Sequence, residues 1–293
     1  MRREQRRRSD PKSARWYKEK QSFLSRRQKA LLRENFPALG IVLRYGEPLD
    51  PQQLLLPVPV PLTPTTQGTL QRRPVILDVG FGLGDSLMHL ARTRPDCLVL
   101  GVEIYQAAVA QAIDKILASA APSSSSPPSA PPSAPSPSTS STSSTSSSSS
   151  APPSADSSSS SGGGGINNVR LIRGDLLLLL QQNLIDASLD DVYVCFPDPW
   201  YSDQDRRVLR PETVALLERK LRPGGRLRLA TDVAEMAAWV EALIQGRPAG
   251  TWMPTMRVES APLEGPGDRA RTLYEAKAVE LGHRVWDLEW RRL

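Results

Sequence analysis

The sequence predicts an α/β domain built on a mostly parallel, seven-stranded sheet with helices on both faces. Short apolar runs alternate with helix-like segments along most of the 293-residue chain, and this alternation implies parallel strands joined by right-handed crossovers. The first run, 74–79, leads directly into glycine-rich sequence, and the later parallel runs end in acidic residues. Both features predict a ligand site at the carboxyl ends of the strands.

Each element is expected from its apolar pattern and its flanking residues. The expected strands are 74–79, 97–103, 169–173, 191–196 and 226–231, followed by two alternating closing strands, 251–258 and 284–290. The expected helices are 85–92, 106–117, 176–182, 212–221 and a segment that runs to about residue 244. Asp85 and Asp175 stand where an N-cap is expected, and Pro223-Gly224-Gly225 is expected to end the helix before it.

Residues 119–165 are almost entirely Ser, Pro, Ala, Thr and Gly. This segment has no large apolar side chains to offset the entropy of ordering, so it is predicted to be a disordered insertion between a helix and the next strand. A linker between two domains is the alternative. No stretch of the chain approaches the roughly 20 apolar residues that a membrane-spanning helix needs, which predicts no membrane partner.

The chain has 37 Lys and Arg against 31 Asp and Glu, and 13 of the basic residues fall within residues 1–33 beside three acidic ones. We therefore divide the chain into a basic N-terminal arm, 1–33, and a domain, 34–293. The arm is either a solvated tail or a segment that contacts nucleic-acid phosphates; a transit peptide fits less well because the arm has few serines. Two cysteines, Cys97 and Cys195, and two histidines predict neither a disulfide framework nor a metal site.

The glycine-rich loop after the first strand contains Asp78, Gly80, Gly82 and Gly84. Its spacing differs from the dinucleotide fingerprint, and a purely structural turn is the alternative. Glu103 ends the second strand, where α/β nucleotide-binding proteins hydrogen-bond the ribose hydroxyls. Together the loop and the acid favour a nucleotide-like ligand.

A rigid carboxylate follows the fourth strand. In Phe196-Pro-Asp-Pro-Trp200, two prolines fix φ on either side of Asp198 and an aromatic ring lies two residues further on. A stiff carboxylate beside an aromatic ring suits a flat, hydrogen-bonding substrate such as a nucleobase. Asp175, Asp232 and Thr272 also fall near predicted strand or loop ends, where each has the alternative of being an ordinary N-cap.

Taken in order, these segments resemble the bacterial-type tRNA (guanine-N7)-methyltransferases, which are Rossmann-like class I methyltransferases. The segments that carry the resemblance are Asp78-Val-Gly-Phe-Gly-Leu-Gly-Asp-Ser86, Gly101-Val-Glu103, Arg173-Gly-Asp175, Phe196-Pro-Asp-Pro-Trp200, Pro223-Gly-Gly225, Ala230-Thr-Asp232, Thr272-Leu-Tyr-Glu275 and Gly282-His-Arg-Val-Trp-Asp287. The resemblance extends from about residue 22 to the C-terminus, apart from the Ser/Pro-rich tract. The glycine loop is shared with many methyltransferases, whereas the segments around Asp198 and Tyr274 are specific to this family.

The resemblance implies S-adenosylmethionine as methyl donor, no metal, and methylation of guanine N7 in tRNA, with guanine 46 of the variable loop as the family's target. Asp198 would be the catalytic residue. The other expected roles are cofactor binding by Asp78, Gly80, Gly82, Gly84, Glu103, Asp175 and Asp198, and substrate binding by Ser202, Asp232, Thr272, Leu273, Tyr274 and Glu275. Ser202 departs from the pattern because family members have a Lys there, and Arg206 and Arg207 follow soon after.

Guanine N7 already carries a lone pair, so the expected reaction needs no general base, and alignment of the reactants would supply most of the acceleration. The lack of a long apolar stretch and of a disulfide framework predicts a soluble intracellular protein, in the cytoplasm, a plastid or a mitochondrion. The protein is expected to act as a monomer or homodimer without an obligatory protein partner.

Three rival functions are weighed against this one. Asp198-Pro-Trp200 is similar to the motif of exocyclic-amine methyltransferases but lacks its two consecutive prolines. An NAD-dependent dehydrogenase is disfavoured by the glycine spacing. A tRNA-binding protein that retains the fold without catalysis is the non-enzymatic alternative.

Overall fold

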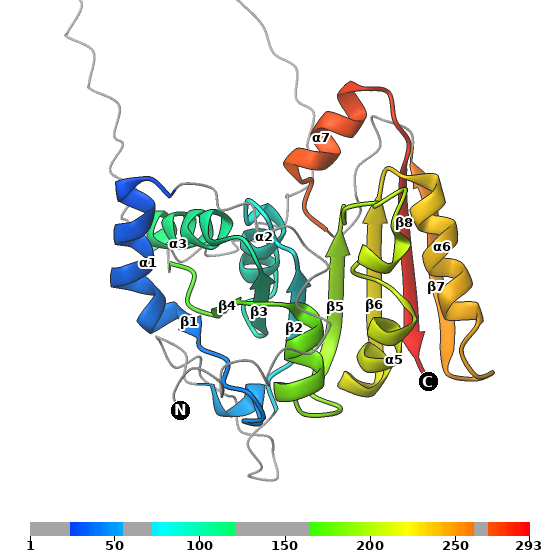
Figure 1. Cartoon of the computed structure of the whole chain (residues 1–293), viewed down its shortest axis with the longest axis horizontal. Coiled ribbons are helices and arrows are strands. Elements are labelled where there is room, and N and C mark those ends of the chain that lie inside the picture. Colours follow the sequence, from blue (N-terminus) through cyan, green and yellow to red (C-terminus); the bar gives the residue numbers. More distant parts are fainter. Residues whose placement is uncertain (1–23, 55–71, 121–164, 261–268) are drawn as a thin grey trace, which may run out of the picture.

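The computed structural model describes residues 24–54, 72–120, 165–260 and 269–293. Within them an eight-stranded sheet has the order β1-β4-β3-β2-β5-β6-β8-β7 (Figure 1). The strands are β1 (Gly40–Ile41), β2 (Val75–Val79), β3 (Leu98–Glu103), β4 (Val169–Arg173), β5 (Leu189–Cys195), β6 (Leu221–Thr231), β7 (Trp252–Ser260) and β8 (Val285–Arg292). All neighbours from β1 to β6 are parallel, and β8 pairs antiparallel with both β6 and β7.

This architecture confirms the predicted α/β fold with a mostly parallel sheet. The count of seven strands was one too few, because the two-residue strand β1 adds an edge beside β4. Such a short strand has no apolar periodicity of its own, so only its pairing in the folded chain reveals it.

Helices cover both faces of the sheet. They are α1 (Arg26–Leu39), α2 (Asp85–Thr93), α3 (Gln106–Ala120), α4 (Leu176–Leu178), the π-helix η4 (Leu179–Asn183), α5 (Pro211–Lys220), α6 (Ala234–Gln245) and α7 (Leu273–Glu280), with short 3-10 turns η3 (Pro51–Gln53) and η5 (Gln204–Arg206). One apolar cluster joins η4, α5 and α6 to the sheet, and a second joins α1, α2 and α3 to the other face. Alternate residues of β2 serve the two clusters: Val75, Leu77 and Val79 belong to the first and Ile76 to the second.

The strand order reverses beside β2. From β2 the chain moves outward through β3 and β4, and it then returns to place β5 on the other side of β2. In parallel sheets the crevice at such a switch point is where ligands bind.

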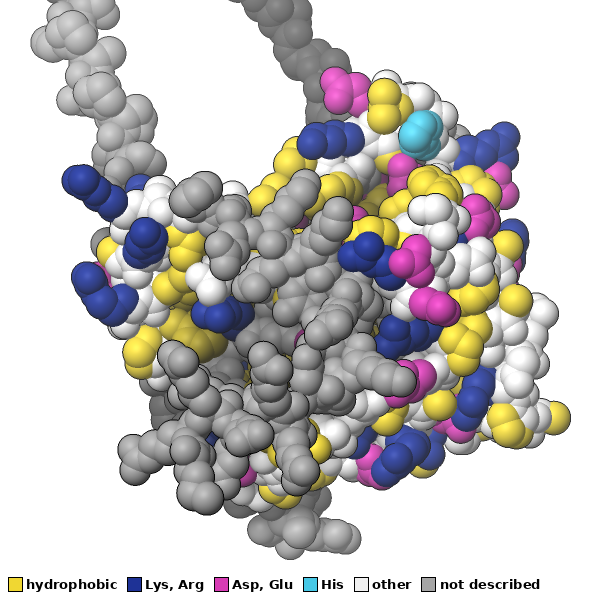
Figure 2. Space-filling model, in the orientation of Figure 1, with side chains coloured by type: hydrophobic (Ala, Val, Ile, Leu, Met, Phe, Trp, Pro, Cys, Tyr) yellow, Lys and Arg dark blue, Asp and Glu magenta, His cyan; other side chains and the backbone are white. Residues whose placement is uncertain are grey.

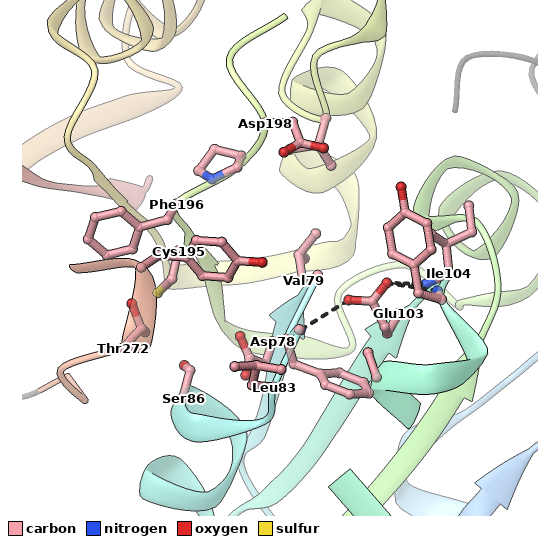
Figure 3. A pocket seen from close by; sticks show the side chains of 18 of the residues that line it. Asp78, Val79, Leu83, Ser86, Glu103, Ile104, Cys195, Phe196, Asp198 and Thr272 are labelled. Carbon is pink, nitrogen blue, oxygen red and sulfur yellow. Dashed lines mark hydrogen bonds between the residues drawn. The ribbon is translucent and has the colours of Figure 1, made fainter. Parts of the chain in front are cut away.

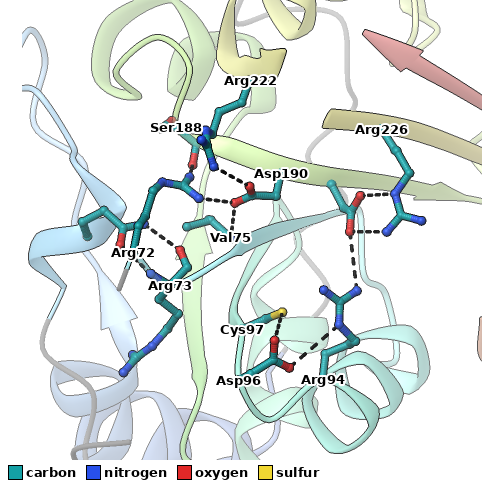
Figure 4. A network of polar contacts seen from close by, with 12 residues as sticks. Arg72, Arg73, Val75, Arg94, Asp96, Cys97, Ser188, Asp190, Arg222 and Arg226 are labelled. Atoms are coloured by element: carbon teal, nitrogen blue, oxygen red, sulfur yellow. Dashed lines mark hydrogen bonds and ion pairs between the residues drawn. The ribbon is translucent and has the colours of Figure 1, made fainter. Parts of the chain in front are cut away.

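The opposite, amino edge of the sheet is held by arginine–aspartate pairs (Figure 4). Asp190 accepts hydrogen bonds from Arg72 and from the backbone of Val75, each at 2.7 Å. Asp191 accepts from Arg226 at 2.6 Å. These contacts join the starts of β2 and β5 to β6, so the edge away from the switch point is fixed.

The described residues on either side of the Ser/Pro-rich tract meet at this amino edge. Ser119, at the end of α3, accepts a hydrogen bond from the backbone N–H of Ile166 at 3.2 Å. The tract therefore leaves the fold after α3 and rejoins it before β4 at one point. Its central part, 121–164, lies outside the described residues, as do residues 1–23 of the basic arm.

Local expectations differ from the structure in four places. The N-cap of α2 is Gly84 and not Asp85, because Asp85 reaches across to Lys115 at 2.5 Å. Strand β6 begins at Leu221, so the Pro-Gly-Gly segment lies inside it at a shift of register with β5. The family segment that begins at Thr272 starts helix α7, where a loop was expected. Finally, α1 runs through residue 33, where the sequence analysis divided the chain.

Candidate active site

A cavity of about 740 Å³ opens at the switch point. It lies at the carboxyl ends of β2, β3 and β5, between the glycine-rich loop on one side and α7 on the other (Figure 3). Among the predicted site residues, those that line it are Asp78, Gly80, Gly82, Glu103, Asp175, Asp198, Asp232, Thr272, Leu273 and Tyr274. The fold thus brings together residues separated by almost 200 positions in the chain.

The glycine-rich loop turns through left-handed backbone. Gly80 and Gly82 have φ values of 64° and 52° and line the cavity. A side chain at either position would be strained, which explains why glycine is needed where the backbone faces the cavity. Gly84 has a different role: it precedes α2 with φ 82° and faces Ala112 of α3 rather than the cavity.

Glu103 ties the end of β3 to this loop. Its carboxylate accepts hydrogen bonds from the backbone N–H groups of Gly82 at 3.0 Å, Ile104 at 2.6 Å and Tyr105 at 2.9 Å. Burial raises the pKa of Glu103, the three backbone donors oppose that rise, and the charge of Asp198 adds to it. The carboxylate is therefore held in a fixed orientation at the cavity wall.

Asp78 is buried at the end of β2, with 1% of its surface exposed. Neither carboxylate oxygen has a hydrogen-bond partner among the described residues. Burial raises the pKa of Asp78 to about 7, opposed by the Ser86 hydroxyl, which acts on it without reaching hydrogen-bond geometry, and reinforced by the charge of Glu103. A buried, unpartnered carboxyl group beside a cavity is suited to a ligand that brings a cation or a hydrogen-bond donor.

The Phe196–Trp200 loop carries backbone strain. Phe196 and Trp200 both have positive φ, 51° and 41°, which non-glycine residues rarely adopt. Between them, Asp198 is exposed and lines the cavity. Strain of this kind persists only where the surroundings hold the backbone in place.

Arg207 provides that support. Its side chain is fully buried, donates from Nε to the carbonyl oxygen of Pro199 at 2.7 Å, and pairs with Glu235 at 2.5 Å. Arg207 therefore positions the loop from behind and does not face the cavity.

The neighbouring arginine faces the cavity instead. Arg206 lines the cavity, and its guanidinium lies 3.9 Å from the centroid of the Trp200 ring. Ser202 is exposed and does not line the cavity. Ser202 therefore brings no positive charge to the cavity, whereas Arg206 brings a cation from the same loop.

The last predicted segment divides into cavity-facing and buried residues. Thr272 caps α7, its hydroxyl accepting from the backbone of Glu275 at 3.1 Å, while Leu273 and Tyr274 face the cavity. Glu275 is buried away from the cavity and accepts from Arg269 at 2.7 Å. Arg269 also pairs with Asp287 on β8, so this network fixes the start of α7 to the sheet.

Two further acids border the cavity. Asp175 caps α4, accepting from the backbone of Leu177 at 2.7 Å, and its expected capping role is confirmed. Asp232 lies 3.0 Å from Nδ1 of His283.

Three further residues of the site, Tyr105, Lys277 and Arg269, were not predicted from the sequence. Tyr105 and Lys277 line the cavity, and each lies two residues from a predicted site residue, Glu103 and Glu275, a proximity that could have identified them. Arg269 carries no local signal, because its partners come from α7 and β8. The described residues contain no cluster suited to a metal ion and no helix able to span a membrane.

Fold and cavity together define a doubly wound α/β protein with a ligand site at its topological switch point. A family model described as putative methyltransferase matches residues 72–288. The chain is 30% identical over 268 residues to a tRNA (guanine-N(7)-)-methyltransferase of Methylobacillus flagellatus, covering 87% of this chain and 92% of that one. It is 31% identical over 219 residues to the enzyme of the same name from Nitrosococcus oceani, covering 74% and 71%.

The solved structure of the 16S rRNA methyltransferase KamB is similar at 16% identity and a TM-score of 0.46, over 75% of this chain and 87% of that one. On the sequence matches, the chain belongs to the tRNA (guanine-N(7)-)-methyltransferase family.

Proposed function

We propose that this protein transfers a methyl group from S-adenosylmethionine to N7 of guanine in tRNA, with guanine 46 as the target. The observation that carries the proposal is the shared cavity, in which a nucleotide-type wall containing Glu103 faces a strained loop presenting Asp198. Two ligands, a cofactor and a base, can then meet in one cavity.

The residues of the first wall fit S-adenosylmethionine. The unpartnered oxygens of Asp78 match an ammonium group, and the carboxylate of Glu103 matches the two hydroxyls of a ribose. Gly80 and Gly82 leave room for the ligand to approach the backbone. When bound, S-adenosylmethionine supplies a methyl group that is electrophilic without metal assistance.

The second wall is suited to guanine. Asp198 accepts hydrogen bonds from the N1–H and N2–H edge of the base, which leaves N7 free of protein donors. Its negative charge also favours the cationic base that methylation produces. Because the loop is held by Arg207, the carboxylate contributes mainly by orientation.

Several features support tRNA as the substrate. Relatives that share about 30% identity over most of the chain are named for it, and Arg206 brings positive charge to the loop of Asp198. We propose that the basic arm, 1–33, adds affinity for phosphates, and that the protein acts as a monomer or homodimer.

The proposal is tested by incubating the full chain with S-adenosylmethionine and unmodified tRNA, followed by borohydride and aniline cleavage at N7-methylguanine. Cleavage at guanine 46 is expected, and a transcript with adenine at that position is the matched control. Methylation of a tRNA at an exocyclic amine, or of the control transcript, would contradict the proposal. Cofactor and tRNA binding without methyl transfer would favour a binding protein instead.

A further inference from the structure

A row of basic side chains lies along the exposed face of α1. Arg26, Lys29 and Arg33 occupy positions i, i+3 and i+7, which fall on one side of a helix, and all three are exposed. At 1.5 Å per residue the row is about 10 Å long. We call these three residues the α1 basic row.

The position of the row is unfavourable for the helix itself. The first turn of α1 contains no acidic residue, and cations at a helix N-terminus oppose the macrodipole. The backbone donors of that turn are already used, because Ser25 and Gln28 form a capping box. Residues that destabilise the helix they belong to are expected where they bind a partner.

The row also differs from the other basic residues nearby. Arg27, on the adjacent face, pairs with Asp114 of α3 at 2.6 Å. Arg26 and Lys29 have no acidic partner within ion-pair distance among the described residues. In the described part of the chain, the acidic partner of Arg33 is its exposed neighbour Glu34, a contact worth little in water.

The row lies on a helix that packs against α3, one of the helices that border the cavity. Strand β1 follows α1 directly and pairs parallel with β4, so α1 lies beside the edge of the sheet (Figure 1). Helix α1 packs on α3, and Ala107, Ala108 and Gln111 of α3 line the cavity. The space-filling view shows basic side chains gathered over α1 (Figure 2).

We propose that the α1 basic row binds backbone phosphates of the tRNA whose guanine enters the cavity. This inference rests on the proposed function. Residues 1–25 carry nine further Lys and Arg and precede the row directly in the sequence, so the row extends the basic segment into the described part of the fold. Each phosphate neutralised by the row releases counterions, which makes binding depend on salt.

The test compares two double variants of the full chain in equilibrium tRNA binding at several salt concentrations. Arg26→Gln/Lys29→Gln is expected to weaken binding roughly tenfold at low salt and to reduce the slope of log affinity against log salt by about 1.4 to 1.8. Its kcat at saturating tRNA and its affinity for S-adenosylhomocysteine stay unchanged, and its melting temperature does not fall because two cations leave a helix N-terminus. The control, Arg219→Gln/Arg222→Gln, removes the same charge at the amino edge and binds tRNA within about twofold of wild type.

An unchanged affinity and salt slope in the α1 variant, or a loss equal to that of the control, would overturn the inference. Weakened binding of S-adenosylhomocysteine would also overturn it, since the row would then act on the cofactor wall. Wild-type protein that binds tRNA without methylating it refutes the proposed function alone, so the two failures are distinguishable.

Discussion

The Nε–H of Arg207 donates to the carbonyl oxygen of Pro199 at 2.7 Å, from a side chain with no exposed surface. This bond supports the loop in which Phe196 and Trp200 hold left-handed backbone. Arg207→Met should lower the free energy of unfolding by about 2–3 kcal/mol, because a buried carbonyl loses a charged donor. It should also lower kcat for tRNA, since Asp198 loses its fixed position.

Denaturant unfolding and single-turnover kinetics measure the two effects. Arg207→Lys is the matched variant: it keeps the charge without the planar fork and should recover part of the stability and less of the rate. Full activity in Arg207→Met would show that the loop holds its conformation unaided.

Asp198 is exposed and carries little of the fold, so its substitution separates chemistry from stability. Asp198→Asn should reduce kcat by at least about a hundredfold, because the carboxylate charge facing the base is lost, while the free energy of unfolding changes by less than about 0.5 kcal/mol. Methyl incorporation into tRNA measures the rate, with Asp205→Asn, an exposed acid outside the cavity, as control. Undiminished activity in Asp198→Asn contradicts the assigned role.

The raised pKa of Asp78, about 7 in the folded protein against 3.8 ordinarily, makes stability depend on pH. The unfolded chain releases this proton near pH 4 and the folded chain keeps it until about pH 7, so stability falls as pH rises through this window and is level above it. The total is on the order of 4 kcal/mol. Thermal unfolding of wild type and Asp78→Asn from pH 4 to 8 should show this contribution only in wild type.

The same group predicts how cofactor binding varies with pH. A ligand ammonium favours the ionised carboxylate, so affinity for S-adenosylhomocysteine should rise with pH up to about 7, with proton release on binding. Calorimetric titration in buffers of different ionisation enthalpy counts the protons. Equal release in Asp78→Asn would assign the proton to another group.

Removal of residues 121–164 should leave methyl transfer unchanged, because Ser119 and Ile166 already meet across the gap. Replacement by a six-residue Gly/Ser linker shortens the loop about sevenfold and should stabilise the fold by up to about 2 kcal/mol. Activity assays and thermal unfolding test both parts. A loss of activity would mean that the tract takes part in substrate binding.

Deletion of residues 1–20 removes nine Lys and Arg and should weaken tRNA binding and flatten its salt dependence. Filter binding between about 50 and 200 mM salt measures the slope. An unchanged slope would show that residues 1–20 make no phosphate contacts.

Most of the sheet could be predicted from the sequence, because buried parallel strands such as β3 read as continuous apolar runs. Helix α1 was missed since its basic residues obscured the apolar positions Leu32, Phe36 and Leu39, whose i, i+4, i+7 spacing was present. The position of the cavity could also be predicted, because the topology of a parallel sheet brings the Gly-rich and acidic strand ends together.

What the sequence did not reveal depends on contacts between distant elements. Asp85 pairs with Lys115 instead of capping its helix, and Glu275 turns inward to Arg269 instead of toward the cavity. Local propensity does not predict either side-chain orientation, because each depends on an ion-pair partner that lies outside its own helix and is near only in the folded protein.

The contact between Ser119 and Ile166 has a further consequence. It lies where α3 ends and β4 begins, at the amino edge, whereas the cavity opens at the carboxyl edge. Anything attached through the tract is anchored on the side of the molecule away from catalysis. The enzyme can thus be tethered, or fused to another folded module, by this anchor with its working face still directed outward.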